Sequence, residues 1–384
     1  MLKKCDLCGS LNHLKIYKPY NSKKNTIIKI CKRCGLCFSK FGKKLNKISN
    51  LFGAAFGGLR SGKALLFEEF FNDFNEILKR KNFYKKKSNC LIVGGQNSNK
   101  FIHILKSYFF NIDIIEPDLR FFSKNFNKVK YTYDTFENFK ARKKYDIIFL
   151  PHTLEHLQSP DYFFSKAKSI LSENGLIYIS VPDTAIISKY TPNITEFFLD
   201  KHKYHFTEKT LKNYLIKHNY KSLKCFKYSK NNIRRLSIIL SKKKVKINKS
   251  KITNRYDETY KIIKIYKDNM RKDIKKLKNK FLLLDNYLSK KNVVAWAIGR
   301  IFTDYCMRGM KFKKFKLFID SNYKSQKYLE NFLKIKIMPP SHAFEEIANI
   351  DKIIVFSDAF YKQIIKNVSL KKYKKLFSTY TDLL

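Results

Sequence analysis

The sequence predicts an α/β protein with three parts: a small four-cysteine N-terminal domain, a doubly wound α/β sheet, and a second α/β unit. Three observations lead to this prediction. Two CxxC pairs lie near the N-terminus, apolar runs alternate with amphipathic stretches from residue 89, and a similar alternation begins at residue 293. A chain of 384 residues has room for two or three domains. We expect domains at residues 1–50, 65–245 and 291–384, with a helical linker over 250–290.

Composition supports folded domains with ample cores. Hydrophobic residues make up 44% of the chain and aromatic residues 15%, which excludes a disordered protein. No apolar run reaches the ~18 residues that a membrane span needs. Cys5 and Cys8 come before the apolar core of a signal peptide could begin, so we expect no signal peptide and a cytoplasmic protein.

The net charge is +49, from 80 basic and 31 acidic residues, and such an excess is typical of proteins that bind nucleic acid or acidic lipid. However, Lys is spread along the whole chain and Asn and Ile are abundant, a composition that an A/T-rich genome would also produce. Nucleic acid is therefore a partner that we keep open but do not favour. The densest basic run, KKKVKINKSK at 242–251, suits a solvated linker as well as a partner site.

The first two cysteine pairs predict a metal site. Cys5 and Cys8 form CDLC, and Cys31 and Cys34 form CKRC. Two thiolates at this spacing on a tight turn face one metal, and two such turns close a tetrahedral four-thiolate zinc site. Glycine follows each pair, where a knuckle turn favours positive φ. Such a closed site is structural, and the nearby Cys37 is expected to be a spare thiol.

The central region has the pattern of buried parallel strands separated by helices. We expect strands at Cys90–Val93, Ile112–Ile115, Ile147–Leu150 and Leu176–Val181, with a short one at Val129–Tyr133. We expect helices at Lys100–Tyr108, Leu119–Phe126 and Asp161–Leu171, the last ended by a turn at Glu173–Gly175.

Ligands bind a doubly wound sheet at the carboxyl ends of its strands. Three features fall there: the loop GGQNSN with Gly94, Gly95, Asn97 and Asn99; Glu116; and the segment PHTLEH, which contains His152. Glu116 follows Gly95 by roughly 20 residues, the spacing at which a carboxylate binds ribose hydroxyls. The alternative for Glu116 is an exposed strand-end acid.

Two further motifs match known functional patterns only in part. GGLRSGKA at 57–64 has Walker A spacing but ends in Ala64, so the hydroxyl that holds Mg²⁺ is missing. We interpret it as the entry to an amphipathic helix at Leu65–Lys79. HTLEH at 152–156 matches a metalloprotease pattern that requires a helix, yet a strand and Pro151 precede it. We expect a strand-end loop that turns into a helix.

Residues 145–183 have the sequence YDIIFLPHTLEHLQSPDYFFSKAKSILSENGLIYISVPD. They resemble the strand-four to strand-five region of class I S-adenosylmethionine-dependent methyltransferases. KHKYHFTEKTLKNYLIKHNY, residues 201–220, resembles the segment that follows in that family. The resemblance implies an enzyme with a Rossmann-like sheet of seven strands, which Leu223–Tyr228 and Leu236–Leu240 would complete as an antiparallel pair. It also implies that Gly94, Gly95, Asn97, Asn99, Glu116 and His152 bind S-adenosylmethionine.

The order of the parts, with a four-cysteine head first and a second α/β tail last, resembles the sugar C-methyltransferase family. That resemblance implies a small, nucleotide-linked sugar acceptor in surface-polysaccharide or related carbohydrate biosynthesis, structural zinc, and a Rossmann-like C-terminal domain. In the family the first strand ends in an acid followed by G-x-G-x-G. Here Val93 stands at the acidic position, and Gly95, Asn97 and Asn99 stand at the glycines. Asn is the residue that best replaces Gly at left-handed φ.

The family's histidine base is also implied by the resemblance. The pattern E-H-x-x-[YF]-F aligns Lys201 with the Glu and His202 with the His, while His205 falls at the aromatic position. His202 is thus the candidate base and His205 the second catalytic candidate. The alternative for both is packing of a loop.

The remainder of the chain predicts a long helix and a second sheet. Apolar residues over 255–290 follow 3–4 spacing with only Lys267 interrupting, so the helix packs within its chain or against a second copy, in a monomer or homodimer. VVAWAIG (293–299), FKLFIDSN (315–322) and DKIIVFSDAF (351–360) read as strands. Two other functions stay open beside sugar methylation: an RNA-modifying methyltransferase, and a non-catalytic methyltransferase-like binding protein with an altered loop.

Overall fold

The structure is a computed structural model of the chain. It describes residues 4–19, 26–40, 72, 73, 75, 88–94, 99–117, 129–189, 197–198, 202–228, 235–242, 252–321, 323, 327–343, 349–357, 360–366 and 374–383. The chain divides into two compact units. Apart from Phe197, the described residues up to Tyr266 belong to the first unit and those from Lys267 onward to the second.

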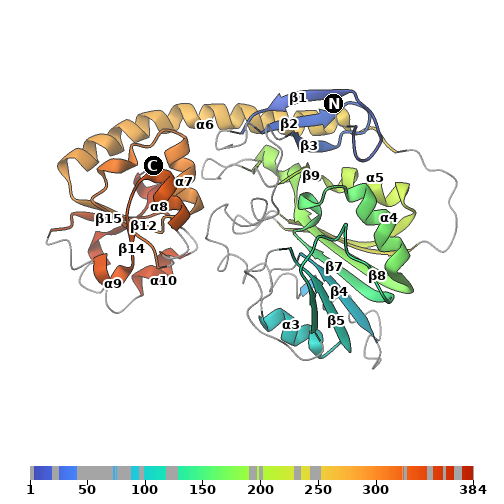
Figure 1. Cartoon of the computed structure of the whole chain (residues 1–384). Coiled ribbons are helices and arrows are strands. Elements are labelled where there is room, and N and C mark those ends of the chain that lie inside the picture. Colours follow the sequence, from blue (N-terminus) through green and yellow to red (C-terminus); the bar gives the residue numbers. More distant parts are fainter. Residues whose placement is uncertain are drawn as a thin grey trace. The chain divides into compact units, whose positions relative to one another are not determined.

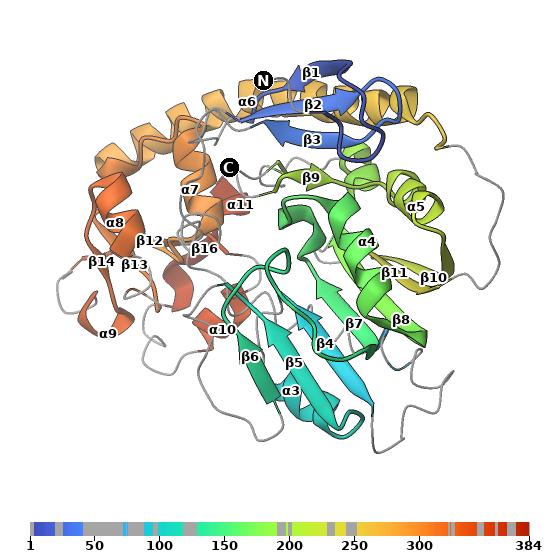
Figure 2. The same cartoon turned by 45° about the vertical axis from the view of Figure 1, so that its right-hand side comes forward.

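The N-terminal part of the first unit is a small antiparallel sheet. It contains β1 (His13–Tyr17), β2 (Ile27–Cys31) and β3 (Cys37–Lys40), and the short β9 (Tyr204–His205) joins as its fourth strand. Figure 2 shows β9 beside β3. The turn after Cys34 requires glycine, because Gly35 has φ +77° and a Cβ there would lie 2.4 Å from the carbonyl of Arg255.

The central sheet is the predicted doubly wound sheet with seven strands. Its order is β10-β11-β8-β7-β4-β5-β6, and the five strands from β8 to β6 run parallel. Figure 1 labels β8, β7, β4 and β5, and Figure 2 labels all seven strands. The strands are β4 (Asn89–Val93), β5 (Asn111–Ile115), β6 (Val129–Thr132), β7 (Tyr145–Pro151), β8 (Leu171–Pro182), β10 (Tyr220–Tyr228) and β11 (Arg235–Lys242). The antiparallel pair β10–β11 completes the sheet, as expected.

Both faces of the sheet are buried, which explains the continuous apolar runs of its strands. In β4, Leu91 and Val93 face one core and Cys90 and Ile92 face the other. The first core includes side chains of α4 (Pro160–Ile170) and α5 (Glu208–Lys217), and the second includes those of α3 (Asn99–Lys106). Helix α4 begins after Ser159, whose Oγ accepts a hydrogen bond from the Tyr162 N–H.

One boundary differs from the prediction. The turn expected at Glu173–Gly175 is wrong, because β8 already begins at Leu171, which pairs with Tyr145 of β7. A register shift between Tyr145 and Ile147 accommodates the early start. The expected helix at Leu119–Phe126 and the motif at 57–64 lie outside the described residues. Of the expected helix Leu65–Lys79, only residues 72, 73 and 75 are described, and they are helical.

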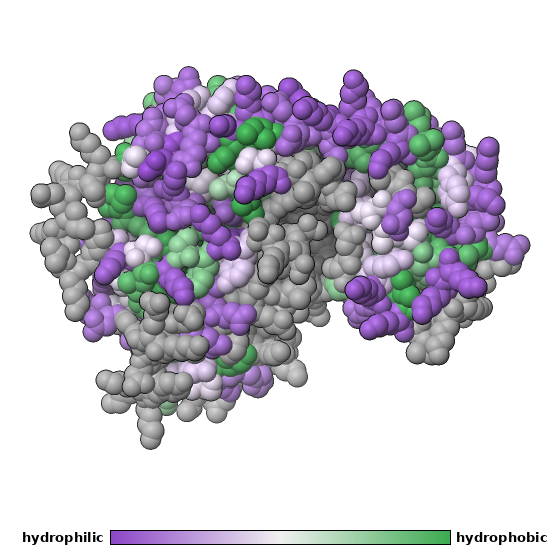
Figure 3. Space-filling view, turned by 180° about the vertical axis from the view of Figure 1, so that it is seen from behind, coloured by the Kyte–Doolittle hydropathy of each residue, from purple (hydrophilic) through white to green (hydrophobic). Residues whose placement is uncertain are grey.

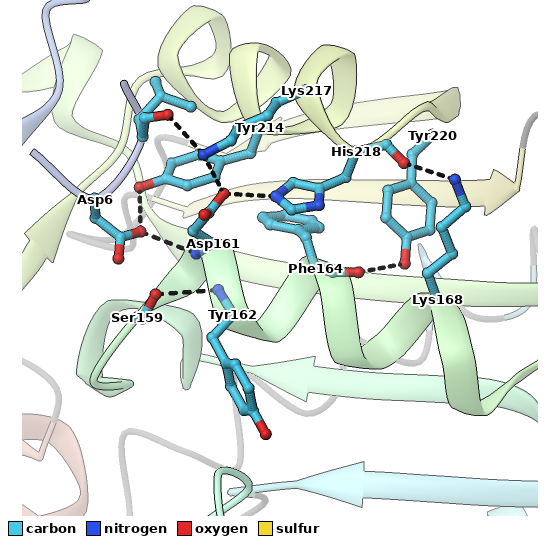
Figure 4. A network of polar contacts seen from close by, with 11 residues as sticks. Asp6, Ser159, Asp161, Tyr162, Phe164, Lys168, Tyr214, Lys217, His218 and Tyr220 are labelled. Atoms are coloured by element: carbon cyan, nitrogen blue, oxygen red, sulfur yellow. Dashed lines mark hydrogen bonds and ion pairs between the residues drawn. The ribbon is translucent and has the colours of Figure 1, made fainter. Parts of the chain in front are cut away.

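Asp6, between the first two cysteines, connects the small sheet to the central domain (Figure 4). Its Oδ2 accepts hydrogen bonds from the backbone N–H of Asp161 at 2.9 Å and from the Tyr214 hydroxyl at 2.8 Å. Since Asp161 lies in the first turn of α4, Asp6 caps a helix that belongs to another part of the chain. Lys217 adds a hydrogen bond to the carbonyl of Leu7 at 3.0 Å.

The carboxylate of Asp161 completes this network. It lies 2.6 Å from Nε2 of His218 and 2.7 Å from Nζ of Lys217. Burial opposes ionisation of Asp161, but the hydrogen bonds from His218 and Lys217 outweigh it and hold the pKa of the carboxyl below its ordinary value. Asp161 therefore joins α4 to α5 as an ionised group.

The long helix expected over 255–290 is α6 (Tyr256–Lys290), and its residues are divided between the two units. Tyr266 rather than Lys267 continues its buried stripe between Ile263 and Met270. Further along, Leu277, Phe281, Leu284 and Leu288 belong to the core of the second unit. Within that unit the buried Arg308 bonds Asp273 of α6 at 3.0 Å and Asp304 at 2.8 Å.

The second unit has a five-stranded parallel sheet of order β14-β13-β12-β15-β16, the expected second α/β fold. Its strands are β12 (Val293–Trp296), β13 (Leu317–Ile319), β14 (Ile337–Met338), β15 (Lys352–Val355) and β16 (Phe377–Thr379). Its helices are α7 (Arg300–Met307), η4 (Phe312–Lys314), α8 (Lys327–Leu333), α9 (Pro340–Ala343), α10 (Tyr361–Ile365) and α11 (Tyr380–Leu383). The sequence predicted β12, β13 and β15 but not the edge strands β14 and β16.

The face in Figure 3 is mainly hydrophilic among the described residues, with hydrophobic side chains in small scattered groups. None of the helices in the described parts of the chain is both long enough and apolar enough to cross a bilayer.

We expect Asp6→Ala to destabilise the first unit by about 1–3 kcal/mol, because it leaves the buried Tyr214 hydroxyl and a helix-terminal N–H without their acceptor. Thermal denaturation and hydrogen exchange at the Asp161 amide measure the effect. The matched control is Glu173→Gln, whose carboxylate side chain is 75% exposed. Unchanged exchange at Asp161 in Asp6→Ala would contradict the capping role.

Candidate active site

The candidate site lies where parallel strands of the central sheet end side by side. Val93 of β4 pairs with Ile115 of β5, and the Gly94 N–H donates to the Ile115 carbonyl at 2.8 Å. This register places Gly94 next to Glu116 at one edge of the sheet. The sequence predicted both residues as cofactor-binding, and the strand register is what makes them neighbours.

Gly94 is the described part of the predicted cofactor loop. It has φ +64°, and a Cβ there would lie 2.6 Å from the side chain of Thr153. Position 94 therefore requires glycine for its backbone conformation and for the close approach. Gly95 and Asn97 lie outside the described residues, and Asn99 is described only as the first backbone position of α3.

Glu116 follows β5 and is 4% exposed. Its backbone N–H donates to the carbonyl of Thr132 at 3.1 Å, which fixes the end of the strand. The alternative of an exposed strand-end acid is wrong, because Glu116 is buried. Strand β4 ends in Val93 where the resemblance implies an acid, and the Val93 side chain is buried.

The HTLEH segment follows β7 and is tied to this edge. His152 has φ +49°, uncommon for a non-glycine residue, and its N–H donates to the Ser180 carbonyl at 2.9 Å. The Thr153 hydroxyl donates to the Gly94 carbonyl at 3.0 Å. A 3₁₀ turn, η2 (Leu154–His156), leads on toward α4. The expected strand-end loop is confirmed, and no α-helix runs through 152–156.

Glu155, His156 and His202 gather beside this loop. Their candidate ligand atoms all lie within 4.8 Å of one another, and the rings of His156 and His202 are 4.9 Å apart between centroids. The segment that carries His202 is held here because the Lys203 N–H donates to the Glu155 carbonyl at 2.8 Å. The family's glutamate position is occupied by Lys201, but the carboxylate of Glu155 lies close to His202 instead.

Glu155 is 1% exposed. Its Oε1 lies 3.5 Å from Nδ1 of His152 and 3.9 Å from Nε2 of His156. Burial opposes ionisation, but the hydrogen bond from His152 and the charges of His156 and His152 outweigh it, so the pKa of the Glu155 carboxyl is below its ordinary value. Glu155 is thus a buried, ionised carboxylate between histidines.

His205 has different surroundings. It lies in β9, paired with Cys37, and its Nε2 lies 2.9 Å from the Ser39 hydroxyl. Burial lowers the pKa of His205 to about 3, so its imidazole is neutral at physiological pH. The structure connects this second catalytic candidate to the N-terminal sheet.

The four predicted metal cysteines come together. Cys5 and Cys34 have their Sγ atoms 3.6 Å apart, and those of Cys8 and Cys31 are 3.5 Å apart. A zinc ion at ~2.3 Å from four thiolates spaces them about 3.8 Å apart, so the four side chains fit one tetrahedral ion. Cys37 is buried and lies outside this group, as expected for a spare thiol.

Sequence reasoning missed Glu155 and His156 as site residues. The signal was present in HTLEH, but the motif was weighed only as a helical protease site. It also missed Asp183, which follows β8, is 1% exposed and accepts a hydrogen bond from the Ala185 N–H. Burial raises the pKa of Asp183 above its ordinary value. Asp183 precedes the 3₁₀ turn η3 (Thr184–Lys189).

Residues 65–224 match the family model described as "Methyltransferase domain". Together with the seven-stranded sheet, this match identifies a methyltransferase domain in the first unit. This part of the chain therefore has the enzyme class that the sequence predicted for it, a methyltransferase.

Three solved structures illustrate the likeness of this domain. A protein classed as an S-adenosylmethionine-dependent methyltransferase from Listeria monocytogenes is 17% identical with TM-score 0.37, over 44% of this chain and 97% of its own. One from Clostridium acetobutylicum is 13% identical with TM-score 0.33, over 46% and 99%. The 1,6-didemethyltoxoflavin-N1-methyltransferase of Burkholderia thailandensis is 12% identical with TM-score 0.33, over 54% and 95%. No curated protein matches the chain.

We expect Gly94→Ala to destabilise the first unit by about 1–3 kcal/mol, because it adds left-handed strain and a collision with Thr153. Gly9→Ala is the matched control, since Gly9 has φ +72° but no atom within 4 Å of an added Cβ. The difference between the denaturation midpoints of the two variants measures the collision with Thr153, because both variants share the strain of positive φ. Equal losses would show that the contact with Thr153 is unimportant.

Proposed function

We propose that this enzyme transfers a methyl group from S-adenosylmethionine to a small, sugar-derived acceptor. The observation that carries the proposal is the shared strand-end edge, where Gly94 and Glu116 are adjacent and Thr153 ties the HTLEH loop to Gly94. Gly94, Gly95, Asn97, Asn99, Glu116 and His152 would form the cofactor site. Glu116 would accept hydrogen bonds from the ribose hydroxyls.

Methyl transfer is an in-line displacement at the methyl carbon, so positioning of donor and acceptor supplies much of the rate. Two buried carboxylates, Glu116 and Glu155, follow strands β5 and β7 of the central sheet, and His156 and His202 lie beside Glu155. In this proposal His202 accepts the acceptor's proton and Glu155 orients its imidazole and stabilises the positive charge. His205, bonded to Ser39, is a positioning residue for the segment that carries His202.

The sugar-type acceptor is supported by the order of the parts. A four-cysteine head precedes the methyltransferase domain and a second α/β unit follows it, as in the sugar C-methyltransferases that the sequence resembles. The proposed domains are residues 1–50, 65–245 and 291–384 with a helical linker at 250–290. We propose structural zinc on Cys5, Cys8, Cys31 and Cys34, and a cytoplasmic location, where reduced thiols such as the eight unpaired cysteines are typical.

Calorimetric titration with S-adenosylmethionine and with S-adenosylhomocysteine tests the cofactor site. We expect saturable binding to the wild-type chain and about 10- to 100-fold weaker binding to Glu116→Gln, which loses a charged acceptor for the ribose. Glu173→Gln, with its exposed carboxylate, is the control and should bind as the wild type does. Absence of heat at high micromolar cofactor would reject the proposal.

The base role is tested by methyl transfer to a panel of nucleotide-linked sugars. We expect His202→Gln to lower the rate by about a hundredfold or more while cofactor affinity is retained, because a positioned base contributes on this scale. His103→Gln changes an exposed histidine of α3 and is the control. An undiminished rate in His202→Gln would remove His202 from the mechanism.

A further inference from the structure

Glu155, His156 and His202 form a second group of metal-ligand side chains, separate from the four cysteines. Each offers one donor atom, and all three donors lie within 4.8 Å of one another. They converge from two distant segments, η2 after β7 and the stretch that precedes β9. Convergence of two imidazoles and a carboxylate goes beyond what a single proton-accepting histidine requires.

The backbone holds this group in place before any ligand binds. The Lys203 N–H bonds the Glu155 carbonyl at 2.8 Å, and the His156 N–H bonds the Thr153 carbonyl at 2.9 Å. The Lys203 carbonyl in turn accepts from the Ser39 N–H at 2.8 Å. Because both segments are fixed by backbone hydrogen bonds, the donors are preorganised rather than assembled from free loops.

The carboxylate of Glu155 gives a second, independent indication that a cation binds here. Oε1 has histidine neighbours, but Oε2 is buried and has no hydrogen-bond partner among the described residues. A buried carboxylate oxygen without a partner costs several kcal/mol. A bound cation would satisfy Oε2 and compensate the negative charge.

We propose that Glu155, His156 and His202 bind a divalent transition-metal cation. Two imidazoles and one carboxylate are the donor set that proteins use for Zn²⁺, Fe²⁺, Co²⁺ and Mn²⁺. Metal–ligand bonds of ~2.1 Å place such donor atoms about 3–3.5 Å apart. Side-chain rotations that move the donor atoms by about an ångström would therefore close the site. The side chains of His156 and His152 are 14% and 26% exposed, which leaves an entry from solvent.

His152 fits the role of an outer partner. Its Nδ1 lies 3.5 Å from Oε1 of Glu155, where a histidine orients a ligating carboxylate. Three protein ligands leave coordination positions for oxygen atoms of the acceptor, and the cation would polarise an acceptor hydroxyl. His202 would then serve as a ligand in the metal-bound enzyme, whereas it is the base of the proposed function only in the metal-free enzyme. This catalytic role rests on the proposed function, whereas cation binding itself does not.

Cobalt substitution of the full-length chain tests the site without cofactor or acceptor. Co²⁺ bound by four thiolates gives intense near-ultraviolet charge-transfer bands, whereas Co²⁺ bound by nitrogen and oxygen gives only weak visible bands. We expect two cations per chain by elemental analysis after dialysis, one with each signature. Mn²⁺, a harder ion that thiolates bind poorly, is expected to occupy only the second site and to lose its free-ion electron paramagnetic resonance signal.

Glu155→Gln and His156→Gln are expected to weaken Mn²⁺ binding at least tenfold while the thiolate bands of Co²⁺ remain. Those bands report that the N-terminal domain is still folded, and the partly exposed His156 provides a variant that leaves the buried carboxylate in place. His103→Gln is the control and should bind both cations. A single cation per chain with thiolate bands only, or equal Mn²⁺ binding in all variants, would overturn the inference. Failure here with intact S-adenosylmethionine binding leaves the proposed methyl transfer standing.

Discussion

The arrangement of the first unit depends on one extended segment, His202–Phe206, which is hydrogen-bonded to three other parts of the chain. On one side β9 pairs with β3 of the four-cysteine sheet, through Cys37 and Phe38. On another, Lys203 bonds the Glu155 carbonyl, and at its end Phe206 accepts from the Thr184 N–H after β8. The position of His202 is therefore set jointly by the N-terminal sheet, the HTLEH loop and the end of β8.

This segment gives the four-cysteine domain a role beyond local stability. A metal bound by Cys5, Cys8, Cys31 and Cys34 would stabilise the sheet in which strand β3 pairs with β9. The same domain presents Asp6 to the first turn of α4, which begins just after the HTLEH segment. Hydrogen bonds thus connect the four-cysteine domain to both segments that carry the candidate catalytic side chains.

The site balances burial against charge. Glu116, Glu155 and Asp183 are acids near the strand ends that are less than a twentieth exposed. The protein separates their environments: histidine neighbours lower the pKa of Glu155, and burial raises that of Asp183. Carboxyls with opposite shifts in one region suit acid and base tasks that differ, a pattern typical of catalytic sites.

Periodicity alone predicted most of the central sheet. Buried parallel strands such as Cys90–Val93 must be apolar on both sides, so their sequence identifies them without knowledge of their neighbours. The start of β8 could not be predicted this way, because Leu171 joins the sheet only through its pairing with Tyr145. The edge strands β14 and β16 are two and three residues long, too short for any period to be visible.

For the site, the sequence by itself predicted the four cysteines and Glu116 from their spacing, and Gly94 from its place after a strand. It predicted His202 through the resemblance to a family pattern. Only the tertiary structure decided that Glu155 and His156 lie with His202 and that His205 faces Ser39. These contacts join residues that are far apart along the chain; Ser39 and His205, for example, are separated by 166 positions. They arise from strand pairing and backbone hydrogen bonds between segments, which no local pattern of residues encodes.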